Sequence, residues 1–125
     1  MQNMVKMTKG QTEAQISEAL IKFEKEFMGR GPRETVSHII KDAIFMRLKG
    51  VLTPAEEQLA KTSEGAKLIK KTRVELLESG MALLGKIVFD ITDCETTSMH
   101  SDICTKTGEK IIVFILDRNL ESMFK

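Results

Sequence analysis

The fold is decided by one stretch of sequence, MHSDICTKTGEK at residues 99–110 followed directly by IIVFIL at residues 111–116. A polar segment passes through a Gly-containing turn into a wholly apolar segment, which is the pattern of a β-hairpin. Because side chains alternate between the two faces of a strand, segment 111–116 should be apolar on both faces of its sheet. Helices can cover one face. The other needs a second cover: a partner subunit, the N-terminal arm or a short helix.

A helix is predicted over about residues 13–28 by apolar side chains that recur every three or four positions. These side chains belong to Ile16, Leu20, Phe23 and Phe27. Thr12 and Gln15 fit a capping box at the start, and a glycine at position 29 can take the left-handed conformation that ends a helix. Residues 1–11 show no such period, so we expect a flexible arm over 1–11 and a single domain over 12–125.

Two further strands should lie over about residues 35–40 and 43–48, because both runs are rich in β-branched or alternating apolar residues. Lys41 and Asp42 form the predicted turn between them, although neither is a glycine that could supply a positive φ. The C-terminal hairpin is predicted to pair a strand over about 95–104 with a strand that begins near residue 110.

Two helices are predicted between the hairpins. The first starts with an N-cap, a first-turn proline and a capping-box carboxylate, which are Thr53, Pro54 and Glu56. The second should run over about residues 64–91, with Gly80 and Gly85 in its interior. Each glycine costs about 1 kcal/mol relative to alanine. Two interpretations of these glycines stay open: they allow close packing against another backbone, or the helix simply tolerates the loss of stability.

The element order α-β-β-(α)-α-β-β predicts an α+β fold, a two-layer sandwich with a four-stranded antiparallel sheet. The chain has 125 residues, of which 42% are hydrophobic and 30% charged. It is therefore long enough to bury one core and too apolar to be disordered.

The charge balance argues against a nucleic-acid partner. The chain carries 19 Lys and Arg against 18 Asp and Glu, a formal net charge of +1, so little counterion release would drive binding to DNA or RNA. It has six Phe but no Trp or Tyr, which leaves few aromatic side chains to stack on bases.

The cysteines and the apolar runs indicate a cytoplasmic protein. Cys94 and Cys104 form neither a disulfide framework nor a metal knuckle, and on one extended strand they would lie too far apart to bridge. This usage is typical of a reducing compartment. The apolar run at 111–116 is too short to span a bilayer and residues 1–10 do not read as a signal peptide, so we expect no direct membrane insertion.

The side chains most capable of chemistry gather in the C-terminal hairpin. On an extended strand His100, Asp102 and Cys104 share one face, about 6.6 Å apart between neighbours. A metal would need ligands within about 2–2.3 Å of one centre, and side chains on one straight strand diverge from that geometry. No activated nucleophile with a base and an orienting group is present. We therefore expect no metal site, no cofactor and no catalytic residue.

The same hairpin offers a mixture of hydrogen-bond donors and acceptors at a rigidly anchored tip. We interpret this set as a recognition edge for a partner, formed by His100, Asp102, Lys106 and Glu109. A basic edge is a second candidate, formed by Arg30, Arg47 and Lys49, which would suit an acidic segment or a phosphate. The alternative for the basic set is a scatter of solvated charges. Residues 105–108 lack phosphate-loop spacing, so a plain hairpin turn is predicted there.

Several stretches resemble the MpsC-like family of small soluble bacterial proteins. They are residues 29–32, 47–56, 59–62 with Gly65, 100–109 and 116–121. The resemblance runs in register over about residues 14–121. It departs at Lys41, where the family usually has Gly before Asp, and at Cys104, where Ser is common. The second departure argues against an essential cysteine.

The family is named for the soluble component of a cation-translocating system that generates membrane potential, whose companions are membrane subunits linked elsewhere to inorganic-carbon uptake. The resemblance implies a non-enzymatic accessory protein with integral-membrane transport subunits as partners, held peripherally at the inner face of the membrane through a partner. Because strand 111–116 is apolar on both faces, we also expect a homodimer. Two other classes stay open on the sequence alone, a small nucleic-acid-binding module and a small-ligand-sensing module.

Overall fold

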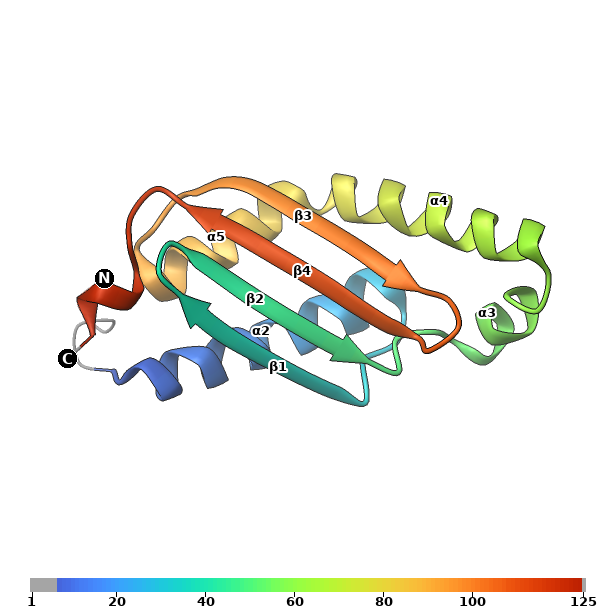
Figure 1. Ribbon diagram of the computed structural model, residues 1–125, viewed down its shortest axis with the longest axis horizontal. Coiled ribbons are helices and arrows are strands. Elements are labelled where there is room, and N and C mark those ends of the chain that lie inside the picture. The colour runs from blue at the N-terminus through green and yellow to red at the C-terminus, as the bar shows by residue number, and fades with distance from the viewer. Residues whose placement is uncertain (1–6, 125) are drawn as a thin grey trace.

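The computed structural model describes residues 7–124. The elements alternate between helices and hairpins in the predicted order (Figure 1). They are α2 (Lys9–Met28), β1 (Glu34–Ile40), β2 (Ala43–Lys49), α3 (Pro54–Leu59), α4 (Ser63–Ser79), α5 (Met81–Thr92), β3 (Thr96–Cys104), β4 (Glu109–Leu116) and the 3-10 helix η1 (Glu121–Met123). The predicted α+β class, with a four-stranded antiparallel sheet, is confirmed.

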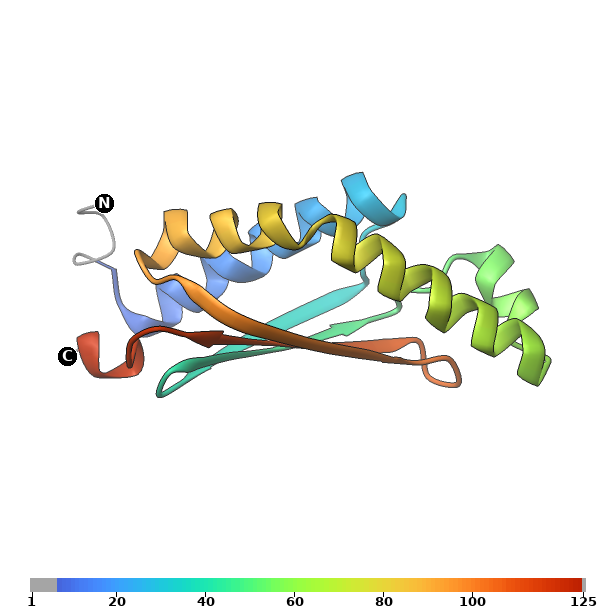
Figure 2. The same ribbon diagram turned by 90° about the horizontal axis from the view of Figure 1, so that it is seen from above.

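The strands lie in the order β1-β2-β4-β3, so β4 is an inner strand and β3 is an edge strand. Each hairpin pairs within itself, and the pairing of β2 with β4 joins the two hairpins into one sheet. Figure 2 shows α2, α4 and α5 on one side of this sheet, whereas no element of residues 7–124 lies over the opposite side.

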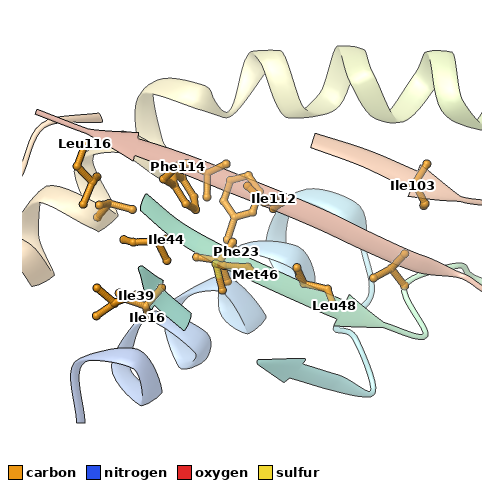
Figure 3. Close-up of a cluster of buried hydrophobic side chains, with 14 of the residues drawn as sticks. Ile16, Phe23, Ile39, Ile44, Met46, Leu48, Ile103, Ile112, Phe114 and Leu116 are labelled. Carbon is orange, nitrogen blue, oxygen red and sulfur yellow. The ribbon is translucent and has the colours of Figure 1, made fainter. Parts of the chain in front are cut away.

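The core lies between the sheet and the helices (Figure 3). The side chains of β4 that face the helices are fully buried, and they are Ile112, Phe114 and Leu116. The side chains of α2 that meet them follow the predicted spacing, and they are Ile16, Leu20 and Phe23. The alternate residues of β4 remain partly exposed, since they face the side without helices. The strand is thus apolar on both faces, and the elements within residues 7–124 cover one of them.

Helix α2 begins at Lys9, about four residues before the predicted start. Its N-cap is Thr8, whose hydroxyl accepts the Gln11 N–H at 3.1 Å while the Gln11 side chain accepts the Thr8 N–H at 2.9 Å. Thr12, the predicted cap, is buried in the first turn. The prediction was wrong because two successive Thr/Gln pairs, at 8–11 and at 12–15, fit the same pattern. The last residues of the predicted arm therefore belong to α2, and residues 1–6 lie outside the described residues.

The turn between β1 and β2 lies at Lys41 and Asp42, as predicted. Lys41 has φ +54°, a left-handed conformation that glycine adopts more easily. Its N–H donates to the Glu121 carboxylate at 2.7 Å, and its C=O accepts the Glu121 N–H at 3.1 Å. The C-terminal segment therefore holds this turn without the help of a glycine.

The capping box predicted for the short helix is confirmed. The Thr53 hydroxyl accepts the Glu56 N–H at 3.1 Å, and the Glu56 carboxylate accepts the Thr53 N–H at 2.9 Å. Figures 1 and 2 place α3 beyond one end of the sheet, so this helix does not cover the side that lacks helices.

The single helix predicted over residues 64–91 is two helices, α4 and α5, that meet at Gly80. A Cβ atom on Gly80 would lie 2.7 Å from Cζ of Phe23 and 3.0 Å from Cε2 of Phe27, so the chain bends where it packs against these rings of α2. A Cβ on Gly85 would meet nothing within 4 Å. Close packing therefore explains Gly80, although against aromatic side chains and not against another backbone, and tolerated weakness explains Gly85.

This contrast predicts opposite effects of the same substitution. Gly85→Ala should raise the free energy of unfolding by up to about 1 kcal/mol, because it removes a helix-interior glycine without a clash. Gly80→Ala should lower that free energy, because the new methyl group overlaps a buried ring. Urea denaturation of both variants measures the difference. Effects of equal sign would contradict the packing at Gly80.

Candidate interaction surface

The side of the sheet without helices, called the open face below, has an apolar centre. Its apolar side chains are Val36 and Ile40 from β1, Ala43 and Phe45 from β2, and Ile111, Val113 and Ile115 from β4. All except Ile40, which is 53% exposed, are partly buried by their neighbours in the sheet. A contiguous apolar surface of this kind marks an interaction site more often than isolated exposed apolar residues do.

Two histidines stand on opposite sides of this apolar centre. The register places His38, Phe45, Val113 and His100 in one row across the four strands. The ring centroids of His38 and Phe45 lie 6.4 Å apart, and the His100 ring contacts the Ser98 hydroxyl at 3.4 Å. Three strand spacings separate the histidines by about 14 Å, which is too far for both to bind one metal ion.

The four residues of the predicted recognition edge occupy different positions. His100 lies on the open face, and Lys106 lies in the turn between β3 and β4. The Asp102 carboxylate accepts the backbone N–H of Ile103 at 2.8 Å and lies 3.4 Å from the Lys70 ammonium group of α4. The Glu109 carboxylate accepts hydrogen bonds from Arg47, described below.

The predicted basic set meets the recognition edge at two points. The Arg47 guanidinium donates to the Glu109 carboxylate at 2.8 and 2.6 Å across the open face. Arg30 lines a hollow of about 210 Å³ together with Lys106, and its Nη1 donates to the Leu52 C=O at 3.0 Å. Lys49 lines a separate shallow hollow that also contains Arg47. Charges of both signs therefore surround the apolar centre.

Two ion pairs on the helix side of the sheet were not predicted from the sequence. Lys110 Nζ donates to Glu24 Oε2 at 2.8 Å, and both side chains are at most 3% exposed. Arg73 donates through Nε and Nη2 to the Glu56 carboxylate at 2.9 and 2.7 Å, and through Nη2 to the Val51 C=O. Among these four residues, the sequence had indicated a role only for Glu56, as the capping-box residue of α3. That role gave no indication of its ion pair with Arg73.

The Glu56 carboxyl group is held in its charged form. Burial acts to raise its pKa, but hydrogen bonds from Arg73 and Thr53 outweigh burial and leave the pKa below the ordinary value for Glu. Arg73 thus faces a carboxylate at neutral pH, and this partner fixes one side of its guanidinium group.

The two thiols differ in environment. Cys94 is buried, and burial raises the pKa of its thiol. Cys104 is exposed, and hydrogen bonds from the Thr107 hydroxyl and from backbone N–H groups of the turn lower the pKa of its thiol. Cys104 therefore has the greater thiolate character of the two.

Within residues 7–124, the His, Cys, Asp and Glu side chains form no group of three or more that could hold a metal ion. In that same part of the chain, no helix combines the length and the apolar character needed to cross a bilayer.

Comparisons with known proteins identify relatives over nearly the whole chain. The family model described as "Na+-translocating membrane potential-generating system (MpsC)" matches residues 8–118. The chain is 41% identical over 117 residues to the uncharacterized protein YbcI of Bacillus subtilis (strain 168), covering 94% of each protein. It is 22% identical over 111 residues to the uncharacterized protein YrhF of the same strain, covering 86% of this chain and 88% of YrhF. No solved structure gives a significant match.

The thiol environments predict selective modification. With Ellman's reagent, Cys104 should react in the folded protein and Cys94 only after denaturation, because thiolate and access are both required. The pH at which Cys104 reacts at half its maximal rate should rise in Thr107→Val, which removes the hydroxyl donor. Equal rates for both thiols in the folded protein would contradict these environments.

Proposed function

Because the chain belongs to the MpsC family, we propose that it is a non-enzymatic accessory component of a cation-translocating system that generates membrane potential, of the kind linked to inorganic-carbon uptake. In this proposal the chain acts by binding other proteins, namely a second copy of itself and integral-membrane transport subunits. The observation that carries the proposal is the open face, an apolar sheet surface with charged residues of both signs around it.

The proposed location is the cytoplasm, at the inner face of the membrane, where a membrane-embedded partner holds the chain. The family description supplies the association with a membrane system. The two cysteines are free, which suits a reducing compartment.

A second copy is the proposed occupant of the open face. Two such faces can stack at about 10 Å with interdigitating side chains, as the sheets of a β-sandwich do. The apolar row through Phe45 and Val113 would then be removed from water on both copies. Arg47 and Glu109 neutralise one another within each copy, so bringing two faces together buries no unpaired charge from this pair.

The area of the open face is sufficient for a modest specific interface. Four strands of about seven residues cover roughly 440 Å² in projection. The accessible surface exceeds the projection because side chains stand out from the sheet. Two stacked faces would therefore bury roughly 1,000 Å² or more, at the lower end of specific protein interfaces.

The proposed dimer predicts how charged substitutions change the molecular mass of the protein in solution. Val113→Asp should convert a dimer to a monomer at tens of micromolar protein with the fold intact, because the new carboxylate lies on the open face. Ile112→Asp should instead destabilise the fold, since that side chain is fully buried in the core. Leu68→Asp, on an exposed position of α4, is the matched control and should change neither property. A wild-type monomer by analytical ultracentrifugation would contradict the proposed dimer.

The recognition edge predicts a second defect. Because His100 lies on the open face, the mass of each variant in solution shows whether its binding defect is separate from loss of the dimer. His100→Ala, Asp102→Ala and Lys106→Ala should weaken copurification with candidate integral-membrane transport subunits, while circular dichroism shows an unchanged fold. All three side chains are exposed, so their loss removes partner contacts without opening the core. Undiminished copurification of all three variants would contradict the recognition edge. Failure of the wild-type protein to copurify with any membrane subunit would contradict the accessory role itself.

A further inference from the structure

The hollow of about 210 Å³ that Arg30 and Lys106 line, called the basic hollow below, lies where three loops meet. These loops join α2 to β1, β2 to α3 and β3 to β4, and Figure 1 shows them at the same end of the sheet. The Val51 N–H donates to the Gly108 C=O at 3.1 Å, which joins the second loop to the third. The walls of the basic hollow are therefore fixed relative to one another by the backbone.

Three cationic side chains and one carboxylate line the basic hollow. The cations are Arg30, Arg33 and Lys106, and the carboxylate belongs to Glu57. Within residues 7–124, none of these four side chains forms an ion pair. The lining thus carries three positive charges against one negative charge, and a concave surface with an excess of one sign attracts ions of the opposite sign.

Two of the cations are positioned by the segment that follows β2. Arg30 is partly buried, and its Nη1 donates to the Leu52 C=O at 3.0 Å. The Arg33 side chain lies across Gly50, since a Cβ atom on this glycine would overlap Nε of Arg33 and lie 3.0 Å from its Cγ. Gly50 and Leu52 both line the basic hollow, and at most about 7 Å of backbone separates them. Both arginines are therefore partly ordered before an anion arrives, which lowers the entropy cost of binding.

We propose that the basic hollow binds a phosphate group, either as free phosphate or as the phosphate monoester of a larger molecule. A phosphate presents its oxygens in a tetrahedral arrangement, so cations from different loops can each meet one of them, whereas a carboxylate has two oxygens in one plane. A phosphate monoester carries a charge of about −1.5 to −2 at neutral pH, which matches the excess charge of the lining. The proposal goes beyond the binding of other proteins and does not depend on it.

The rest of the lining limits what the phosphate can be attached to. The described residues that line the basic hollow include no aromatic side chain, so none of them would stack on a nucleobase. Its volume is also below the about 300–1,000 Å³ that is typical of sites enclosing a drug-sized ligand. The basic hollow therefore fits the phosphate group itself and leaves its carrier outside.

The probe for the test is inorganic phosphate, titrated into isotope-labelled protein at constant ionic strength. The amide resonances of Gly50 and Gly108 should shift saturably, with a Kd at or below about 1 mM. Arg30→Gln and Arg33→Gln should each weaken binding about tenfold, because each removes a charge-assisted hydrogen bond. Lys71→Gln removes an exposed charge of α4 outside the basic hollow, so this matched control should change the affinity less than about twofold.

Glu57→Gln tests the basic hollow in the opposite direction. This substitution removes the one carboxylate of the lining, so the affinity for phosphate should rise about threefold or more, while circular dichroism shows an unchanged fold. A purely structural role of Glu57 would not raise the affinity. Lys106 is kept unchanged in these variants, because it also belongs to the recognition edge.

Vesicles distinguish the two sources of the phosphate group. Cosedimentation with phosphatidylcholine vesicles that contain phosphatidate, lost in Arg30→Gln and Arg33→Gln, would assign the phosphate of a lipid headgroup. Binding of inorganic phosphate without cosedimentation would assign a soluble phosphate compound.

Three outcomes would overturn the proposal. The first is no saturable shift at up to about 10 mM phosphate together with no cosedimentation. The second is equal affinity for acetate and phosphate, which would make an acidic protein segment the occupant. The third is unchanged affinity in both arginine variants. These measurements use the isolated protein, so they are distinct from failed copurification with transport subunits, which would bear on the accessory role.

Discussion

The rest of the structure depends on the constraint set by β4, an inner strand that is apolar on both faces. Strand β4 hydrogen-bonds to β2 on one side and to β3 on the other, so its orientation is fixed. One row of its apolar side chains must therefore point to each face of the sheet. The helices cover the face of Phe114 and leave the face of Val113 to its sheet neighbours. A strand of this composition is ordinarily found between two covering layers. The open face is therefore the surface to which we propose that a second copy binds.

Buried charge fixes how the helix layer sits on this sheet. Lys110 begins the apolar part of β4, and its ion pair with Glu24 ties that strand to α2 inside the core. Such a pair costs desolvation energy, but moving α2 away from β4 would leave two buried charges without partners, which costs more. The pair of Arg73 with Glu56 acts likewise on α4 and α3. This pair engages one side of the guanidinium group, and the buried Nη1 on the other side has no hydrogen-bond partner within residues 7–124.

Local sequence signals predicted the elements, while contacts between distant segments determined the details. Both hairpins, the Thr53 cap and the antiparallel sheet follow from short-range patterns, and the structure bears them out. The bend at Gly80 depends on aromatic rings of α2 that lie more than fifty residues earlier in the sequence. The spacing of apolar residues within α4 could not predict this contact. The sequence likewise predicted that Asp102 lies on a polar strand. It did not predict that the Asp102 carboxylate accepts the Ile103 N–H and pairs with Lys70.

The open face and the outer edge of the sheet use different groups of β3. His100 directs its side chain to the open face, whereas the register directs the backbone N–H and C=O groups of Met99 and Ser101 to the outer edge. Binding at one surface therefore leaves the other accessible.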